Sequence, residues 1–353
     1  MNEVVLMAHV LFGVGCIITT VWLFVDVLHA SDANLARIRK LSVAAAVFPD
    51  YWINEFLGLS ETIVLLFTAA VILVAVKLWR APSLRLAAAL GLLCGLAADT
   101  RAEQVLLLPL VLAPVLLFRH GLELRRRIGF TAVGGLAALL VIAPWVGFNM
   151  SRFSHRVIFS TDSGQTLAMA NCRSTYYRTL MGSGDFNCIN RIKAVPGDES
   201  AQNAQYEKVA KAYINAHTDR LPFIVFARVG REFAFYTPMG ELIHENYVNH
   251  RPLTLAEIGL GMYYAMAAAS LYGAVVLWRR RVTIVPFVGI LAELVVTAAA
   301  TYGQTRYRAP FEVVLVVLTG VGVDALLARR SPVPGARVAD PAAPEAPARL
   351  AVR

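Results

Sequence analysis

The chain has 353 residues, of which 57% are apolar and 16% charged, and its mean hydropathy is +0.58. Soluble domains average about 45–50% apolar and about 25% charged residues, so both departures indicate a polytopic membrane protein. They argue against disordered, collagen-like and nucleic-acid-binding chains. The net charge of +9 is interpreted through the placement of the basic residues, because these set the topology of a membrane protein.

Apolar runs of the length that a spanning helix needs, roughly 20 residues, recur along the chain. We predict nine spans, at 4–28, 41–57, 59–78, 83–99, 104–118, 128–148, 256–278, 283–301 and 310–328. The runs 41–57, 83–99 and 104–118 are short, and tilted or re-entrant segments are an alternative for them. The expected fold class is an all-α polytopic membrane protein with about nine transmembrane helices and a small extracytoplasmic insert.

Lys and Arg are distributed unevenly between the turns on the two sides of the predicted bundle. One set of turns, with the tail after the last span, holds 18 of them, whereas the opposite short turns hold three: Arg101, Arg306 and Arg308. The positive-inside rule then places the N-terminus and the long insert outside and the C-terminus in the cytoplasm. The Ala- and Arg-rich composition suggests a bacterial plasma membrane.

This topology divides the chain into four parts. Residues 1–149 form the first six spans, 150–255 the extracytoplasmic segment, 256–328 the last three spans, and 329–353 a cytoplasmic tail. The tail is rich in Pro and Ala and is predicted to be disordered. An outside N-terminus that starts just before a long span, with no signal sequence, predicts that one upstream span is missing from this chain.

The extracytoplasmic segment contains three stretches with a recognisable pattern. Residues 156–170 are predicted to be extended and broken by turns. Residues 201–217 are predicted to form a helix, with one face made of Tyr206, Val209, Ala210, Tyr213 and Ile214. The apolar stretch 222–236 is expected to lie along the membrane surface or against the bundle, with Arg228 and Arg231 on a polar edge.

Four cysteines are too few for a disulfide scaffold, but two of them lie in the extracytoplasmic segment. Cys172 and Cys188 are 16 residues apart, and on an oxidising outer face we predict a disulfide between them. Two free thiols in a compact fold are the alternative. Cys16 and Cys94 lie in predicted spans, where they are expected to serve packing.

Ionisable residues gather in three short turns that the predicted topology places on the outer face. FPDYWINEFLGLSET joins the second and third spans, ADTRAEQ the fourth and fifth, and TYGQTRYRAPFE the eighth and ninth. Carboxylates can act as general bases or metal ligands, and arginines can bind a phosphate bidentately. The residues singled out are Asp50, Glu55, Glu61, Asp99, Arg101, Glu103, Arg306, Arg308 and Glu312.

Several of these residues also have a purely structural interpretation. Asp50 lies beside aromatic residues at a span end and would then mark the membrane interface. Glu61 begins a span, where a carboxylate suits the positive helix N-terminus. Arg101 and Glu103 are close enough in sequence to pair with each other.

Arg306 and Arg308 break the positive-inside pattern, and this favours an anionic partner for them. Glu293 falls within a span and is either paired on its own helix or part of a site. The sequence contains no Walker loop, dinucleotide fingerprint or Ser-His-Asp order, and its seven histidines show no ligand spacing. We therefore predict no cofactor, and we leave a divalent metal open.

Four segments resemble, in the same order, segments of the GT-C-fold membrane glycosyltransferases, in particular the branch of protein O-mannosyltransferases and bacterial aminoarabinose transferases. GLLCGLAADTRAEQVLLLPLVL is similar to the G-L-x-x-L-T-R-P-E segment of that family, and AVFPDYWINEFLGLSET to a Pro…Glu pattern before a span. APWVGFNMSRFSHRVIFSTDSGQTLAMANC is similar to the entry into the outer loop, and QTRYRAPFEVVLVVLTG to a late R-Y-x-x-P before the final span. The resemblance covers roughly residues 5–328.

The resemblance implies a GT-C-like fold and an integral membrane enzyme that transfers a mannose-like sugar from a polyprenyl-phosphate donor to a protein or glycan acceptor. The departing lipid phosphate would be bound by Arg101, Arg306 and Arg308, with Tyr307 orienting the donor. Glu61 and Glu103 would line the site. The family's main catalytic acid lies in a first outer loop that this chain lacks, so Asp50 and Glu61 are substitutes by location only.

Two other functions stay open at this point. A non-catalytic protein that binds or scaffolds lipid-linked sugars would keep the phosphate site without the chemistry. A transporter or flippase of lipid-linked sugars would also need outer-face arginines. Discontinuous helices or an inverted repeat would favour transport, and the sequence shows no internal repeat.

Overall fold

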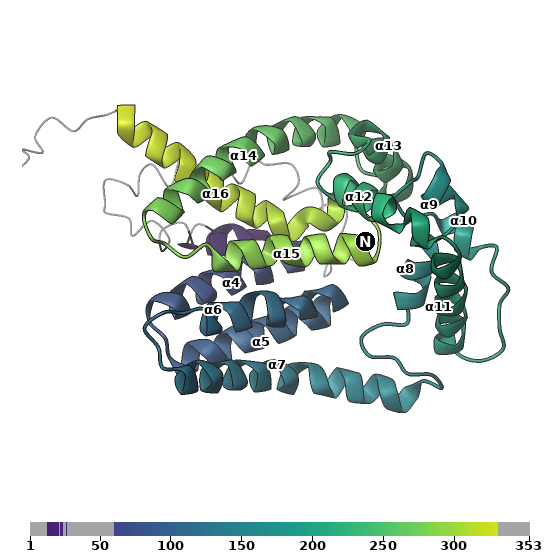
Figure 1. The fold of residues 1–353 in the computed structure, drawn as a ribbon, viewed down its shortest axis with the longest axis horizontal. Coiled ribbons are helices and arrows are strands. Elements are labelled where there is room, and N and C mark those ends of the chain that lie inside the picture. Colours follow the sequence, from purple (N-terminus) through teal and green to yellow (C-terminus); the bar gives the residue numbers. More distant parts are fainter. Residues whose placement is uncertain (1–12, 21, 24–25, 27–59, 331–353) are drawn as a thin grey trace, which may run out of the picture.

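The computed structural model describes residues 13–20, 22–23, 26 and 60–330, and all regular elements with given bounds in this part of the chain are helical (Figure 1). The bundle consists of α4 (Glu61–Arg80), α5 (Leu84–Thr100), η1 (Ala102–Leu106), η2 (Leu108–Leu112), α6 (Ala113–Leu117), α7 (Leu124–Arg152), α14 (Leu253–Arg279), α15 (Val285–Ala300), η4 (Thr305–Arg308) and α16 (Ala309–Arg330). The segment between α7 and α14 forms α8 (Ser163–Ala170), α9 (Arg173–Tyr177), α10 (Phe186–Ile189), α11 (Glu199–Ala216), η3 (Thr218–Arg220), α12 (Leu221–Glu232) and α13 (Pro238–Asn249).

Four helices in the described residues are long and apolar enough to cross a membrane: Glu61–Arg80, Leu124–Arg152, Leu253–Arg279 and Thr305–Ala328. Ala102–Leu117 and Val285–Ala300 are apolar but shorter. The predicted spans from residue 59 onward each coincide with helical structure, whereas 41–57 and most of 4–28 lie outside the described residues. The chain is thus an all-helical membrane protein over the described part, and a total of nine spans stays a prediction.

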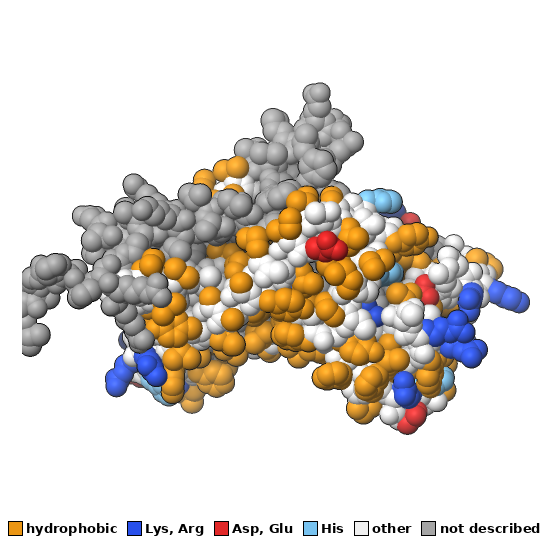
Figure 2. Space-filling view, turned by 90° about the horizontal axis from the view of Figure 1, so that it is seen from above, with side chains coloured by type: hydrophobic (Ala, Val, Ile, Leu, Met, Phe, Trp, Pro, Cys, Tyr) orange, Lys and Arg blue, Asp and Glu red, His pale blue; other side chains and the backbone are white. Residues whose placement is uncertain are grey.

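Exposed apolar side chains cover the bundle, as expected for helices that face lipid. On α7, Leu136, Leu139 and Leu140 are 58–67% exposed. Figure 2 shows hydrophobic side chains spread over the visible surface of the bundle, with Lys and Arg gathered towards the two ends of the molecule. In water such a surface would be unusually apolar for a monomer, whereas in a bilayer it needs no cover.

Glycines let neighbouring helices approach closely at two crossings. A Cβ on Gly91 of α5 would lie 1.9 Å from the carbonyl oxygen of Gly134 on α7. A Cβ on Gly273 of α14 would lie 1.8 Å from the carbonyl oxygen of Leu318 on α16. Small residues at contacts of this kind are typical of helices that pack within a membrane.

The helical segment 102–117 is irregular and sets the position of the polar turn before it. Arg101 has extended backbone dihedrals and separates α5 from η1, which is a 3₁₀ helix. The chain then passes through a π-helical turn at Leu108–Leu112 into α6. Pro109 and Pro114 lack an N–H to donate, so regular α-helical hydrogen bonding cannot run through both positions.

The segment between α7 and α14 lies at one end of the bundle, and the α6–α7 and α14–α15 turns lie at the other (Figure 1). The segment is tied to the bundle by several hydrogen bonds. Gly303 N–H donates to the Gly182 carbonyl at 2.9 Å, and the hydroxyl of Tyr263 on α14 donates to the Phe233 carbonyl at 3.1 Å. We call this part of the chain, residues 153–252, the outer segment.

Two predictions for the outer segment need correction. Residues 163–170 are helical and not extended, because α8 packs on α11 and Gly164 N–H donates to Asn203 Oδ1 at 2.6 Å. The predicted helix 201–217 is confirmed as α11, but its buried residues are Ser200, Ala201, Asn203 and Ala210, and Val209 is exposed. Of the predicted face, Ala210 is thus buried and Val209 is exposed, and small and polar side chains such as Asn203 make the contact with α8.

The stretch 222–236 packs against the bundle as predicted, but Arg228 and Arg231 do not lie on a polar edge. Both side chains are buried, at 3% and 1% exposure. Arg228 donates to the carbonyls of Ala299 and Ala170, each at 3.0 Å, and Arg231 pairs with Glu241 at 2.6 Å. Acceptors contributed by distant elements make burial possible for these guanidinium groups.

The predicted disulfide between Cys172 and Cys188 is present, with the Cα atoms 6.1 Å apart, and the free Cys94 is buried as expected. Replacing Cys172 with serine is expected to lower the stability of the outer segment by about 3 kcal/mol, because the loop of the unfolded chain is no longer closed. A shift in gel mobility upon reduction should occur in the parent protein and be absent from the variant. Equal alkylation of both thiols in oxidised membranes would contradict the disulfide.

Asp198 caps α11 and makes the outer segment sensitive to acid. Its carboxylate accepts hydrogen bonds from the Ser200 hydroxyl and from the backbone N–H groups of Ser154, Ser200 and Ala201, the last three at 2.8, 3.0 and 3.2 Å. The bond from the Ser200 hydroxyl, followed by those from the backbone, holds the pKa of Asp198 below its ordinary value. Because the folded state has the lower pKa, this stabilisation is present at neutral pH and is lost as the pH falls below about 4.

We expect Asp198→Ala to lower the thermal stability at pH 7 and to reduce the further loss between pH 5 and pH 3. Thermal unfolding of the parent protein and the variant at the two pH values measures this difference. Asp219→Ala, which removes another exposed carboxylate of the outer segment, is the matched control. An equal acid-dependent loss in the parent protein and in Asp198→Ala would contradict the role of this cap.

Candidate functional site

Breaks in three helical segments bring the predicted polar residues together at the end of the bundle that adjoins the outer segment. Glu61 is the first residue of α4, Arg101 lies at the break between α5 and η1, and Glu103 lies in η1. Arg306 and Tyr307 lie in η4, a short 3₁₀ helix that follows the non-helical residues 302–304. Each residue therefore lies within a few positions of a break between helical elements.

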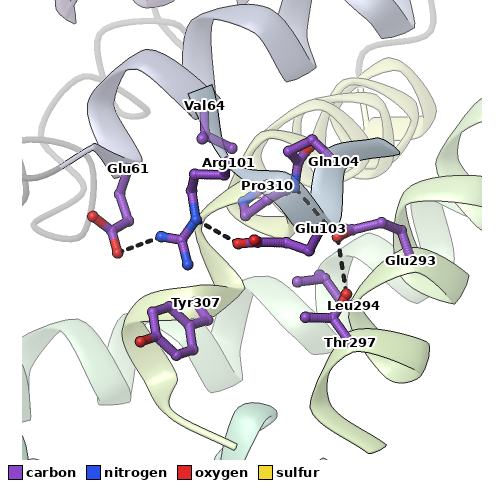
Figure 3. Close-up of a pocket in the computed structure, with 10 residues that line it drawn as sticks. All are labelled: Glu61, Val64, Arg101, Glu103, Gln104, Glu293, Leu294, Thr297, Tyr307 and Pro310. Atoms are coloured by element: carbon purple, nitrogen blue, oxygen red, sulfur yellow. Dashed lines mark hydrogen bonds and ion pairs between the residues drawn. The ribbon is translucent and has the colours of Figure 1, made fainter. Parts of the chain in front are cut away.

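Arg101 lies between two carboxylates (Figure 3). Its Nη1 is 2.7 Å from Glu61 Oε1, and its Nε donates to Glu103 Oε1. The Nε of Arg306 is 3.2 Å from the same Glu61 oxygen. Glu61 is 1% exposed and thus forms ion pairs with two guanidinium groups in a buried position.

The ring of Tyr307 is flanked by the same two arginines. The guanidinium carbons of Arg101 and Arg306 lie 4.6 and 4.8 Å from the ring centroid. The Tyr307 hydroxyl is 2.8 Å from that of Tyr302. Contacts of this geometry are favourable cation–π interactions, and they keep the two guanidinium groups next to the Tyr307 ring.

A small cavity lies at these contacts, and Arg306 adjoins it through its ion pair with Glu61. The cavity is lined by Glu61, Arg101, Glu103 and Tyr307 together with Val64, Gln104, Glu293, Leu294, Thr297 and Pro310. The cavity has a volume of about 10 Å³, which is about what one water molecule needs. The ion pairs therefore fill most of the site. A ligand larger than water can enter only if it displaces them.

Glu293 combines the two roles that its sequence position left open. It lines the cavity and is fully buried, and its Oε1 accepts from Thr297 Oγ1 on its own helix at 3.2 Å. Gln104 Nε2 donates to the same oxygen at 3.3 Å. Its hydrogen-bond donors among the described residues are thus neutral, in contrast with those of Glu61.

The outer segment contributes polar residues to the site that the sequence interpretation missed. Arg306 Nη1 donates to Asn249 Oδ1 at 2.7 Å, and Asn249 Nδ2 donates to Glu245 Oε2 at 2.7 Å. Glu232 Oε2 accepts from the backbone N–H of Gln304 at 3.1 Å. Arg306 therefore connects the bundle, through Glu61, with α13 of the outer segment.

Glu245 is fully buried, and its Oε1 has no hydrogen-bond partner among the described residues. Burial raises the pKa of Glu245, although the positive charges of Arg251 and Arg306 oppose this shift. Burial likewise raises the pKa of Glu232 well above its ordinary value. The spacing Glu241, Glu245 and Asn249 places polar side chains on one face of a helix, and this was the available signal in the sequence.

Arg308, also predicted as a site residue, does not line this cavity. Arg308 is 2% exposed, pairs with Glu312 at 2.6 Å, and lies 3.6 Å from the ring centroid of Tyr263. It faces the packing between η4, α14 and α16. Asp50 lies outside the described residues.

One group of three potential metal ligands occurs in the described part of the chain: Cys172, Asp185 and Cys188. The two cysteines form the disulfide, and Asp185 accepts hydrogen bonds from Ser174 Oγ at 2.5 Å and Asn187 N at 2.9 Å. This group therefore serves the structure of the outer segment, and in its oxidised form it offers no thiolate to a metal.

Comparison of the chain with protein-family models, with curated proteins and with solved structures finds no match.

Proposed function

We propose that this protein is a GT-C-type membrane glycosyltransferase, which transfers a sugar from a polyprenyl-phosphate donor to an acceptor hydroxyl on the extracytoplasmic face. The observation that carries the proposal is the convergence of Arg101 and Arg306 on one buried carboxylate, with Tyr307 between them. Two fixed guanidinium groups on the side of the bundle with few basic turns suit a ligand that brings its own negative charge.

A donor phosphate would take the place of the Glu61 carboxylate. Both groups present anionic oxygens to the guanidinium donors, so the exchange preserves the charge balance of Arg101 and Arg306. Glu61 would then be released from its ion pairs. The exchange would have to enlarge the cavity, since its volume now corresponds to about one water molecule.

An apolar groove close to the site suits the hydrocarbon chain of such a donor. It has a volume of about 430 Å³ and lies between α12, α14, α15 and α16. Its lining includes Phe226, Phe233, Tyr263, Leu291, Val295, Phe311 and Leu315. Helix α15 contributes to both places, with Leu291 and Val295 in the groove and Leu294 and Thr297 in the cavity.

In the proposed reaction the acceptor oxygen attacks the anomeric carbon of the sugar. Its proton passes to a carboxylate, for which the released Glu61 is the first candidate and Glu103 the second. The bond between the anomeric carbon and the phosphate oxygen breaks, and the polyprenyl phosphate leaves with the bonding electron pair. Arg101 and Arg306 would stabilise the negative charge that develops on the leaving phosphate.

Transport of a lipid-linked sugar is the second candidate, and a specific feature favours it. The apolar segment Ala102–Leu117 is discontinuous, with 3₁₀ and π-helical turns next to the site. Interrupted helices that face a polar cavity are typical of secondary transporters.

The test uses the full chain in proteoliposomes that contain a radiolabelled polyprenyl-phosphate mannose. Formation of labelled product with a mixture of peptide and glycan acceptors supports the transferase, and it should be lost in Glu61→Gln but retained in Glu257→Gln, a variant of an exposed carboxylate on α14. Movement of the donor across the bilayer without product would favour the transporter. Donor binding with neither transfer nor movement would favour a binding protein, and lack of binding would refute all three.

A further inference from the structure

Helices α14 and α16 form a second groove, at the end of the bundle opposite the candidate site. The two helices cross closely at Gly273, and a Cβ on Gly322 of α16 would lie 2.8 Å from the carbonyl oxygen of Ala269. Beyond this crossing they separate towards the α14–α15 turn (Figure 1). A groove of about 330 Å³ lies between them there.

The walls of this groove are apolar and its mouth is basic. Val275 and Val276 of α14 face Ala325 and Ala328 of α16, with Tyr272 also in the lining. Arg279 and Arg280, at the end of α14, complete the lining and are exposed. Because Arg279 ends a helix long enough to cross the membrane, the two guanidinium groups lie at the level of lipid headgroups.

We propose that this groove binds an anionic phospholipid of the bilayer, with an acyl chain between α14 and α16 and the phosphate on Arg279 and Arg280. The small side chains of Ala325 and Ala328 leave the room for the chain. The two arginines supply the complementary charge, and basic sites between transmembrane helices on the cytoplasmic side are suited to anionic headgroups.

One further positive charge lies at the mouth of the groove, whereas the carboxylate of Asp324, which precedes Ala325 on α16, is buried at 4% exposure and does not line the groove. Arg281 follows the two arginines and adds a third exposed positive charge at the turn. Arginines at a helix C-terminus also interact favourably with the helix dipole, but this effect does not require a groove beside them.

The experiment titrates the purified full-length protein in detergent with phosphatidylglycerol or phosphatidylcholine and measures lipid retention by native mass spectrometry. We expect tighter retention of phosphatidylglycerol. In Arg279→Gln/Arg280→Gln the affinity of the protein for phosphatidylglycerol should fall by about 30-fold, since each basic residue near the surface contributes about fivefold. Arg125→Gln/Arg126→Gln, which changes two exposed arginines at the start of α7, should leave the affinity unchanged.

A second variant separates the hydrocarbon contact from the charge. Ala328→Phe fills the groove at an exposed position and keeps both arginines, so it should weaken retention while the thermal unfolding midpoint stays near that of the parent protein. Equal retention of the two lipids, an equal loss in the Arg125/Arg126 variant, unchanged retention in Ala328→Phe, or equally effective competition by glycerol phosphate would overturn the proposal.

Discussion

Replacing Arg306 with alanine is expected to reduce sugar transfer by about 10²–10³-fold and to leave the protein inserted and folded. Loss of one fixed donor that stabilises developing negative charge has an effect of this size in acyl-transfer enzymes. Arg306 is 19% exposed at its side chain and contacts Glu61, Asn249 and Tyr307, so its removal leaves one carboxylate still paired with Arg101. The measurement is the initial rate of transfer in proteoliposomes, with donor affinity determined separately.

Arg306→Lys should retain part of the activity, since it keeps the charge but loses the planar fork of donors. Arg125→Ala, at an exposed position on α7, serves as the control for a general effect of removing an arginine. Unchanged transfer in Arg306→Ala would remove this residue from the site. Lower donor affinity with an unchanged maximal rate would assign it to ground-state binding alone.

Asn249→Ala tests the contact between the site and the outer segment. Without this acceptor, Arg306 keeps its ion pair with Glu61 but loses the 2.7 Å hydrogen bond that orients it from α13. We expect a smaller loss of transfer than in Arg306→Ala, of roughly 10-fold, as for a hydrogen bond to a charged group. Tyr247→Ala, which changes a side chain of α13 that is 82% exposed, should leave transfer unchanged.

Glu241→Gln is expected to have the largest effect on stability, a loss of about 3–5 kcal/mol, because it leaves the buried Arg231 without a compensating charge. The two side chains are 0% and 1% exposed and their ion pair is 2.6 Å long. Arg231 also donates to the carbonyls of Thr179 and Met181 at 2.7 and 2.6 Å. The measurement is the thermal or denaturant unfolding of the detergent-solubilised protein.

Lys211→Ala provides the matched control, because it removes one partner of an exposed ion pair with Glu207 on α11. Such pairs contribute about 0.3–0.5 kcal/mol, so the unfolding midpoint should hardly move. If Glu241→Gln and Lys211→Ala had the same small effect, the Arg231–Glu241 pair would not stabilise the outer segment. Glu241→Gln should lower sugar transfer only in proportion to the loss of folded protein, since neither Arg231 nor Glu241 lines the cavity.

The sequence was most informative where structure depends on neighbours along the chain. Apolar runs of spanning length predicted the helical segments from residue 59 onward, and the turns predicted to share one side did bring Glu61, Arg101, Glu103 and Arg306 together. Both results follow from local hydropathy and from the alternation of direction between successive spans. The pairing of Cys172 with Cys188 followed from their common compartment.

Residues of the outer segment were harder to place, because their environment comes from elements far away in the chain. Arg228 and Arg231 were expected at a polar edge, yet Ala299 of α15 and Glu241 of α13 accept their hydrogen bonds in the interior. Val209 was placed on the predicted face of its helix, yet it is exposed, and the small and polar residues Ser200, Ala201 and Asn203 are buried. Asn249 and Glu245 were missed because no local pattern indicates that α13 lies beside η4.

The amino-acid sequence by itself determined the class of the protein, the helical runs and the meeting of the polar turns at one end of the bundle, since these depend on composition and on the alternation of direction between successive helices. Only the tertiary structure decided which arginine meets which acid. Arg101 and Arg306 share Glu61, whereas Arg308 pairs with Glu312 and faces Tyr263. Ion pairing depends on a few ångströms of distance between side chains, and this distance is set by how the whole bundle packs.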